Sequence, residues 1–154
     1  MSGRIEARLK ELGIALPTAA APAANYVPFV VTGNLVFVSG QLPFENGELK
    51  HKGVVGAGVS VEDGARAARL CALNLIAQVK AAVQDLDMVA RVVKLTGFVA
   101  CAPGFADQPK VVNGASDLMV EVFGDPGKRA RAAVGVAALP LGVAVEVDGV
   151  FEVF

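Results

Sequence analysis

The stretch from Val61 to about Gln84 constrains the fold most, because it predicts a long helix that is apolar on more than one side. Ser60 and Asp63 resemble a capping box at its start, although Glu or Gln is the usual third residue of that motif. The apolar positions are Ala65, Ala68, Cys71, Leu75 and Val79 on one face, with Leu70, Leu73 and Ile76 beside them. A helix with so wide an apolar stripe is expected to be buried broadly, against a sheet or between other elements.

Runs of β-branched residues on both sides of this helix predict the strands of such a sheet. The expected order is helix 2–12, connector 14–25, strands 26–31 and 35–39, an optional short strand near residue 54, helix 61–84, strand 88–101, helix 110–123, and strands 132–138 and 143–154. No internal repeat or linker is visible in this order. We therefore expect one α+β domain over residues 1–154, in which residues 1–20 form an N-terminal helix and connector.

The last predicted strand alternates in polarity, which indicates that one of its faces is buried. Val145 and Val147 point to one side, whereas Glu146 and Asp148 point to the other. The turn signal at residues 139–142 predicts a hairpin between the last two strands, and a tight hairpin would pair Arg131 with about Val150. Glu146 would then lie on the same face as Arg131, about 13 Å away along the strand.

The composition predicts a protein that associates with itself. Hydrophobic residues make up 54% of the 154-residue chain and charged residues only 19%, which is too apolar for a disordered chain and leaves few charges to cover a small surface. Every long apolar run is broken by Pro, Gly or a charge, so neither a spanning helix nor a signal peptide is expected. We expect a cytoplasmic subunit that buries part of its surface against copies of itself.

Charge and residue counts exclude several classes of function. The net charge is -1 and the largest basic cluster is residues 128–131, which argues against a nucleic-acid binder. Cys71 and Cys101, with His51 as the single histidine, provide neither a disulfide framework nor a metal site. The glycines at 53, 56 and 58 do not have the spacing of a phosphate-binding loop. We expect no metal and no cofactor, a core thiol at residue 101, and turn residues at 85 and 87.

Arg131 and Glu146 are the strongest candidates for chemistry. A guanidinium binds a carboxylate through two parallel hydrogen bonds, and a glutamate can orient or activate a water molecule. From spacing alone, however, strand residues of these types are more often solvated or paired with each other. If both serve one small ligand, the simplest arrangement is a pocket built between subunits.

The residues around Arg131 also carry a family resemblance. The segment RAAVGVAALPLGVAVEV, residues 131–147, resembles the C-terminal signature of the RidA/YjgF family, also known as endoribonuclease L-PSP or translation-inhibitor proteins. GNLVFVSGQLP at residues 33–43 is similar to the second strand and following turn of that family, and Val112-Asn113 to the start of its second helix. Tyr26 stands at the matching distance before Ser39. The resemblance covers roughly residues 20–154.

The resemblance implies a chorismate-mutase-like α+β fold, with a mixed sheet and two packed helices, assembled as a homotrimer with three clefts between subunits. It implies hydrolysis of reactive 2-imino or enamine acids, such as 2-aminoacrylate, to 2-oxo acids and ammonia, without metal or cofactor. By the same resemblance, Arg131 would hold the substrate carboxylate and Glu146 would position the attacking water. The other implied cleft residues are Tyr26 and Asn113 as lining, the Ser39-Gly40 turn as close backbone, and the backbone of Ala133.

Two alternatives to the imine deaminase stay open. One is a regulatory trimer that binds a small carboxylate without turnover. The other is the ribonuclease of the family's older name. The slightly acidic net charge of the chain and the lack of a second histidine argue against it. The helix at residues 1–20 and a long segment at residues 100–111 mark a longer branch of the family.

Overall fold

The computed structural model describes residues 3–22 and 25–154. Its helices are α1 (Arg4–Glu11), α2 (Val61–Val83) and α3 (Gln108–Phe123), with short 3-10 helices at Leu86–Met88, Asp125–Gly127 and Pro140–Gly142. Its strands are β1 (Phe29–Thr32), β2 (Leu35–Gln41), β3 (Phe44–Glu45), β4 (Glu48–Leu49), β5 (Val54–Val55), β6 (Gly58–Val59), β7 (Val89–Ala100), β8 (Ala130–Val136) and β9 (Val145–Val153). The predicted α+β class is confirmed. The expected helix start at residue 2 and residues 23–24 of the connector lie outside the described residues.

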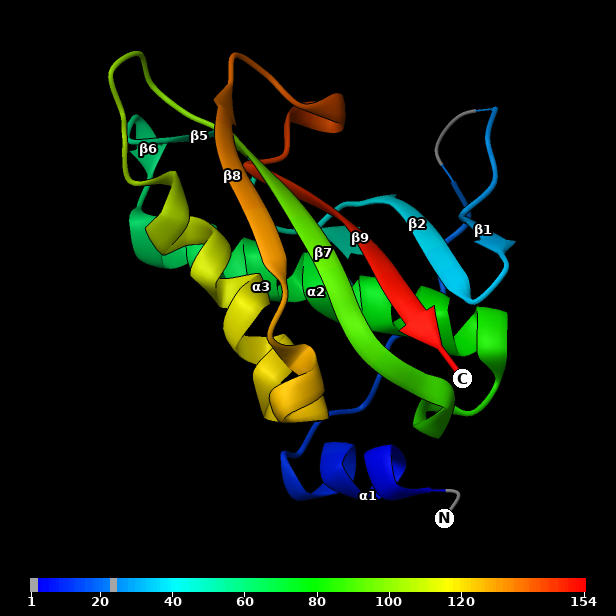
Figure 1. The fold of residues 1–154 in the computed structure, drawn as a ribbon. Helices are drawn as coiled ribbons and strands as arrows, with labels where there is room; N and C mark the ends of the chain where they lie inside the picture. The colour runs from blue at the N-terminus through cyan, green and yellow to red at the C-terminus, as the bar shows by residue number, and fades with distance from the viewer. Residues whose placement is uncertain (1–2, 23–24) are drawn as a thin grey trace.

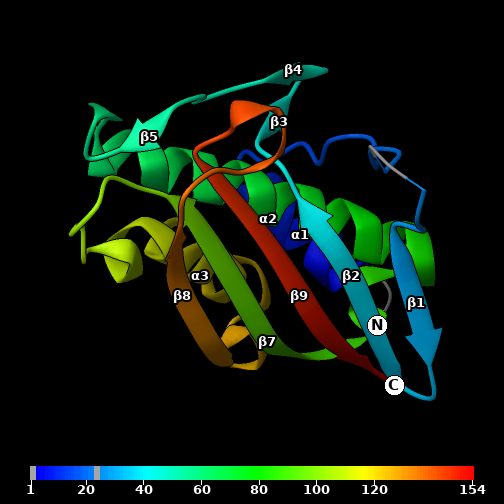
Figure 2. The same ribbon diagram turned by 90° about the horizontal axis from the view of Figure 1, so that it is seen from above.

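The strands of the main sheet follow the order β1-β2-β9-β7-β8. β7 and β8 are parallel and the other neighbours are antiparallel, so the sheet is mixed. Parallel neighbours require a crossover connection, and α3 supplies it between β7 and β8. Figures 1 and 2 show α2 and α3 on one face of this sheet, with α1 beyond them.

The predicted hairpin between the last two strands is wrong, because β7 lies between β8 and β9. The turn at Pro140–Gly142 does not close a ladder. Its flanks bind the loop before β5 instead: the amide of Gly53 donates to the Gly142 carbonyl at 2.9 Å, and the amide of Ala144 donates to the His51 carbonyl at 3.1 Å. The chain therefore crosses the end of β7 before it enters β9.

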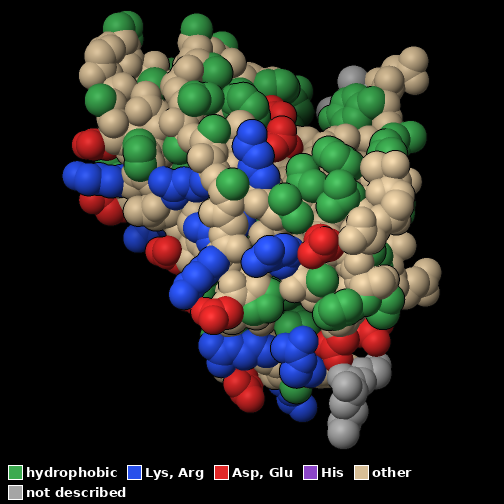
Figure 3. All heavy atoms as spheres, in the orientation of Figure 1, with side chains coloured by type: hydrophobic (Ala, Val, Ile, Leu, Met, Phe, Trp, Pro, Cys, Tyr) green, Lys and Arg blue, Asp and Glu red, His purple; other side chains and the backbone are tan. Residues whose placement is uncertain are grey.

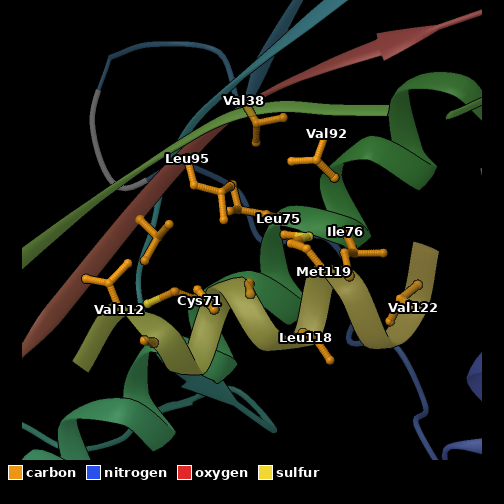
Figure 4. Close-up of a cluster of buried hydrophobic side chains, with 14 of the residues drawn as sticks. Val38, Cys71, Leu75, Ile76, Val92, Leu95, Val112, Leu118, Met119 and Val122 are labelled. Carbon is orange, nitrogen blue, oxygen red and sulfur yellow. The ribbon is translucent and has the colours of Figure 1, made fainter. Parts of the chain in front are cut away.

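The broad apolar stripe of α2 is confirmed as the centre of the core. Leu75, Ile76 and Val79 have no exposed surface and belong to the hydrophobic core. Figure 4 shows Leu75 and Ile76 of α2 among side chains of the sheet and of α3. Ser60 caps the helix, since its hydroxyl accepts a hydrogen bond from the amide of Asp63 at 3.1 Å. α2 and α3 approach so closely that a Cβ at Gly114 would collide with the backbone of α2.

The N-terminal helix is a packed part of the fold. Ile5 and Leu9 are each 2% exposed and belong to the core. The carboxylate of Asp87 accepts hydrogen bonds from the amides of Arg4 and Ile5, at 2.9 and 2.8 Å, and so caps α1. Asp85 caps the 3-10 helix that follows α2. Both acids thus hold the turn between α2 and β7, as predicted for turn residues.

The face of the sheet away from the helices carries apolar side chains. Along the register, Val30 lies opposite Phe37, and Val134 lies opposite Phe98. Val30, Phe37 and Val134 are 51%, 44% and 42% exposed. Figure 3 shows hydrophobic side chains among charged ones on the surface it displays. Within residues 3–22 and 25–154, no helix is long and apolar enough to cross a membrane.

Candidate functional site

Arg131 lies on the edge strand β8, and its side chain is held against α3. Its Nη1 donates to Oδ1 of Asn113 at 2.8 Å and to the hydroxyl of Ser116 at 3.1 Å. Because Asn113 and Ser116 are three residues apart on a helix, they face the same way. The structure thus brings Arg131 and Asn113 together, and α3 orients the guanidinium.

Ser116 was missed in the sequence. It is only 3% exposed, yet the predicted helix 110–123 carries it among apolar positions. A hydroxyl three residues after Asn113 on the buried side of a helix was the available signal, because a buried polar group is expected to have a partner. Ser116 also binds a second arginine, since its carbonyl accepts a hydrogen bond from Arg129 at 3.2 Å.

The surroundings of Arg131 favour an anion. Burial lowers the pKa of the Arg129 guanidinium most, the positive charge of Arg131 lowers it further, and the negative charge of Asp117 acts in the opposite direction. Among the described residues, no carboxylate forms an ion pair with Arg131. Ala133 follows two positions along β8 and therefore shares the face of Arg131. A small carboxylate arriving at this edge would meet the Arg131 guanidinium, whereas Arg129 Nη1 is already bonded to the carbonyls of Ser116 and Gly127.

Glu146 lies on β9, on the sheet face away from the helices. It stands opposite Phe98 in the register, whereas its neighbours Val145 and Val147 are fully buried on the helix side. Burial raises the pKa of the Glu146 carboxyl, and the negative charge of Asp148 raises it further. The prediction that the valines and the acids of this strand face opposite ways is confirmed.

Gly40 provides the space that the Glu146 side chain occupies. A Cβ built on Gly40 would overlap the Glu146 carboxylate, with its Cδ 2.9 Å away. The carboxylate therefore rests directly on the backbone of β2. The structure brings Gly40 and Glu146 together, and only glycine at residue 40 leaves the carboxylate in this place.

Ser39 and Gly40 form a β-bulge, which corrects the predicted turn. Val38 pairs with Gly149 and Gln41 with Val147, so β2 holds one residue more than β9 over this interval. The backbone continues as a strand because β2 pairs with β9 both before the bulge, at Val38, and after it, at Gln41. The Ser39 hydroxyl donates to the Val27 carbonyl at 2.7 Å. Bulges of this kind re-aim side chains and are common beside active sites.

A pocket of about 170 Å³ opens beside Gly40. Its walls come from the end of β2 with its following residues, from the segment before β1, and from the N-terminal connector. The lining residues are Gly40, Gln41, Leu42, Phe44, Tyr26, Pro28, Ala20, Ala21 and Pro22. Tyr26 and Gly40, predicted as cleft residues, thus line one pocket, whereas Glu146 does not line it.

Three buried amide side chains support the pocket, and the sequence reading missed all of them. The Asn74 amide donates to the carbonyls of Leu42 and Phe44, each at 3.1 Å. Gln78 and Gln41 are 1% and 7% exposed, and they contact each other at 3.5 Å. Polar residues at 74 and 78, inside the apolar stripe of the long helix, were the signal, because a buried amide must find partners.

Arg131 and Glu146 do not meet within one chain, which corrects the prediction that they share a face. Arg131 points to the helix side opposite Leu95, and Glu146 points away from the helices opposite Phe98. Their Cα atoms lie about 14 Å apart, because they are separated by two strand spacings of about 4.8 Å each across the sheet and by three residues of about 3.3 Å each along the strands. The described chain thus has two half-sites, one around Arg131 and one around Glu146.

The other candidate side chains have structural surroundings. His51 lies in the loop before β5 with φ at 55°, and its carbonyl binds Ala144. The Cys101 sulfur accepts a hydrogen bond from the Gln108 amide at 3.6 Å. Within residues 3–22 and 25–154, no group of three or more His, Cys, Asp or Glu residues is placed to hold a metal ion.

Comparisons with known proteins place nearly the whole chain in one family model and find similar proteins and structures. The model of the YjgF/chorismate mutase-like endoribonuclease family matches residues 6–151. Protein TCP17 of Trypanosoma cruzi is 53% identical over 152 residues, covering 98% of this chain and 95% of that protein. Atu1372 of Agrobacterium tumefaciens, whose function is unknown, is 54% identical with a TM-score of 0.91, over 97% of this chain and 92% of that one. E. coli TdcF, solved with bound serine, is 28% identical with a TM-score of 0.61, over 89% of this chain and 96% of that one.

Proposed function

This chain belongs to the YjgF/chorismate mutase-like family, and we propose that it hydrolyses reactive 2-imino and enamine acids to 2-oxo acids and ammonia. The observation that carries the proposal is the half-buried Glu146 carboxylate, which rests on the backbone of Gly40 on the sheet face away from the helices. A carboxylate held in a fixed place can activate the water that attacks a bound imine.

Arg131 is proposed to bind the carboxylate of the substrate. Asn113 and Ser116 hold one edge of its guanidinium, which limits the rotation of a long side chain and lowers the entropy cost of binding. A guanidinium held in this way can bind a carboxylate through two parallel hydrogen bonds. Arg129 adds a second positive charge nearby.

Glu146 is proposed to act as the general base and then as the general acid. It takes a proton from water while the water oxygen bonds to the imine carbon and the C=N electron pair moves to nitrogen. It then returns the proton to that nitrogen, which completes a carbinolamine. When the C–N bond breaks, the carboxylate takes the proton of the carbinol hydroxyl as the C=O bond forms and gives it to the leaving nitrogen, so that ammonia and the 2-oxo acid are released. The raised pKa makes this carboxylate a stronger base than an exposed glutamate. Positioning and electrostatics suffice for this reaction, so no metal or cofactor is invoked.

The proposal needs two copies of the chain. Since the two half-sites of one chain lie on opposite faces of the sheet, Arg131 of one protomer is proposed to face Glu146 of a neighbour across a cleft of a homotrimer. The exposed apolar side chains on the uncovered sheet face support association, since burying them would remove apolar surface from water. Sedimentation or light scattering at several concentrations measures the number of copies.

Activity measurements test the proposal directly. An amino-acid oxidase generates imino acids in situ, and the rate of 2-oxo acid formation is followed in the presence of a nucleophile that traps free imine. We expect the protein to accelerate hydrolysis, and Glu146→Gln to lower kcat about 10²-fold or more. Glu152→Gln is the matched control, because Glu152 lies on the same face of β9 and is also partly exposed. No acceleration by the purified protein, or full activity of Glu146→Gln, would refute the proposal.

Arg131→Ala tests the carboxylate site. We expect a raised KM, because the lost interaction is made to a group that does not react. Arg91→Ala is the matched control, since Arg91 is an exposed arginine of the neighbouring strand β7. An unchanged KM in Arg131→Ala would show that the substrate carboxylate binds elsewhere.

A second candidate is a trimer that binds a small carboxylate without turnover. The serine in the related TdcF structure favours it, because a stable amino acid is a ligand and not an imine. Calorimetric titration with serine that depends on Arg131, together with no imine hydrolysis, would select this candidate. RNA cleavage is not proposed, because His51 is the single histidine of the sequence and has no second histidine with which to share acid–base roles.

A further inference from the structure

Two carboxylates stand close together on the uncovered face of β9. Glu146 lies opposite Phe98 of β7, whereas Asp148 lies opposite Thr96. We propose that Asp148 is a positioning residue, which Thr96 and Lys94 keep in its ionised form. Its negative charge then makes Glu146 the carboxyl of the pair that accepts the proton. This inference rests on the proposed function only in giving Glu146 the role of the base.

The first argument is that the two carboxylates have different neighbours. Side chains directly opposite each other on adjacent strands interact. The Thr96 hydroxyl opposite Asp148 can donate a hydrogen bond, whereas the Phe98 ring opposite Glu146 has no such donor. On the side of β2, the Glu146 carboxylate rests against Gly40, which has no side chain to offer. Only Asp148 therefore has a side-chain donor that favours its ionised form.

The second argument is the balance of burial, hydrogen bonding and charge at each carboxyl. Burial raises the pKa of Asp148 most, while the Thr96 side chain, the charge of Lys94 and the Thr96 backbone each lower that pKa. At Glu146 both causes act in one direction, because burial raises its pKa and the charge of Asp148 raises it further. Hydrogen bonds and a cation keep a carboxyl ionised to lower pH, so the proton of the pair goes to Glu146.

A third acid on the same face of β9 follows the same rule as Asp148. Glu152 lies opposite Arg91, and its Oε2 accepts a hydrogen bond from Nδ2 of Asn34 at 3.3 Å. Within residues 3–22 and 25–154, Glu146 is thus the one acid of this strand face with neither a side-chain donor nor a cation opposite it. The neighbours across the strands single out Glu146 as the group that takes up a proton.

The other charged groups of the described chain leave this order unchanged. β2 carries no charged residue between residues 35 and 41, and Arg131 of β8 faces the helix side opposite Leu95. On that side Cys71 of α2 is fully buried. Burial, and then the charge of Glu146, raises the pKa of the Cys71 thiol, which therefore stays neutral. When the environments of two carboxyls differ in this way, their acid and base roles differ as well.

A site-resolved NMR titration tests the order of ionisation. The carboxyl carbon shifts of isotope-labelled protein follow Asp148 and Glu146 separately. In the wild type we expect Asp148 to release its proton at a lower pH than Glu146. The reverse order, or one midpoint shared by both groups, would overturn the inference. The titration needs no substrate, so its result does not depend on whether imino acids are hydrolysed.

Thr96→Val removes the hydroxyl and keeps the shape of the side chain. We expect the midpoint of Asp148 to rise by about one pH unit. The midpoint of Glu146 should fall, because the charge beside it is then lost over the range in which Glu146 titrates. Thr96→Ser should restore both midpoints. Thr32→Val is the matched control, since Thr32 is an exposed threonine on the same sheet face in β1.

Unchanged midpoints in Thr96→Val would refute the role of the hydroxyl. Lys94→Gln is a second variant, at an exposed position where a substitution has little effect on folding. It should raise the midpoint of Asp148, and this rise should shrink as salt screens the charge of Lys94 in the wild type. A midpoint of Asp148 that moves in neither variant would leave nothing of the proposal.

The pH dependence of activity separates this inference from the proposed function. The acid limb of kcat/KM should move to lower pH in Thr96→Val, and Thr96→Val should add nothing in an Asp148→Asn background. If imino acids are hydrolysed but this limb does not move, the deaminase proposal stands and the inference fails. If no imino acid is hydrolysed but the two midpoints shift in opposite directions, the deaminase proposal fails and the arrangement of the two carboxyls stands.

Discussion

Gly40→Ala is the substitution that tests the geometry of the site most directly. The added Cβ would overlap the Glu146 carboxylate, which must then leave its position. The obstacle is the end of a flexible side chain, so the backbone has no need to move. Turning a side chain away from its rotamer costs about 0.5–1.5 kcal/mol, and we expect the free energy of unfolding to fall by about that amount.

The effect on activity should be much larger than the effect on stability. A displacement of about 1 Å in a reacting group can reduce the rate about 10²-fold. We therefore expect Gly40→Ala to lower kcat about 10²-fold on imino acids, while denaturant unfolding shows a change of about 1 kcal/mol. Comparing the two measurements distinguishes a misplaced carboxylate from a misfolded protein.

A double-mutant cycle tests the physical cause. In a Glu146→Ala background the obstacle is gone, so Gly40→Ala should no longer reduce the free energy of unfolding. If the cost of Gly40→Ala is the same in both backgrounds, the carboxylate is not what residue 40 accommodates, and the reasoning is refuted. This outcome is read from stability alone and does not depend on which reaction the protein catalyses.

Three other perturbations have defined outcomes. Leu9→Ala should lower the free energy of unfolding by about 2–3 kcal/mol in denaturant titration, because Leu9 is 2% exposed in the core; a change below about 0.5 kcal/mol would contradict the docking of α1. Hydrogen bonds to Asp87, with that from the amide of Ile5 having the largest effect, lower the pKa of its carboxyl. The contribution of Asp87 to stability is therefore present above its unfolded pKa and is lost as the pH falls through the lower folded pKa. Hydrogen exchange of the α1 amides should accelerate in that acid range in the wild type, and Asp87→Asn should remove this pH dependence. Burial raises the pKa of the Glu146 carboxyl most, and the negative charge of Asp148 is the second cause. Asp148→Asn removes that charge, so it should lower the pKa of Glu146 and move the acid limb of the kcat/KM profile to lower pH. An unmoved limb would mean that another group titrates there.

The elements of this fold could be predicted because their signals are local. The wide stripe of α2 and the alternation of Val145, Glu146 and Val147 follow from periods of 3.6 and 2 residues, which depend only on backbone geometry. The short strands β3 to β6 were largely missed, because two-residue ladders in a glycine-containing loop leave no periodic pattern. The optional strand near Val54 is present as β5.

The candidate site was less predictable than the fold. Arg131, Glu146 and Gly40 were selected from the sequence by their chemistry and by resemblance, and the structure gives each a specific surrounding. The hairpin that was expected to relate the first two was wrong, because a turn signal reports a reversal of the chain and not the partner of the next strand. Ser116, Gln41 and Gln78 were missed because their importance comes from contacts with residues distant in sequence.

The sequence by itself determined the helices, the long strands, the one-sided burial of the last strand and the family. Each of these depends on neighbours a few positions apart or on residue identity. Only the tertiary structure decided that β7 separates β8 from β9, that Arg131 and Glu146 face opposite ways, and that the connector at residues 20–22 lines a pocket with Gly40. Strand order and pocket walls arise from pairing between residues far apart in the sequence, and no local pattern specifies which strands become neighbours.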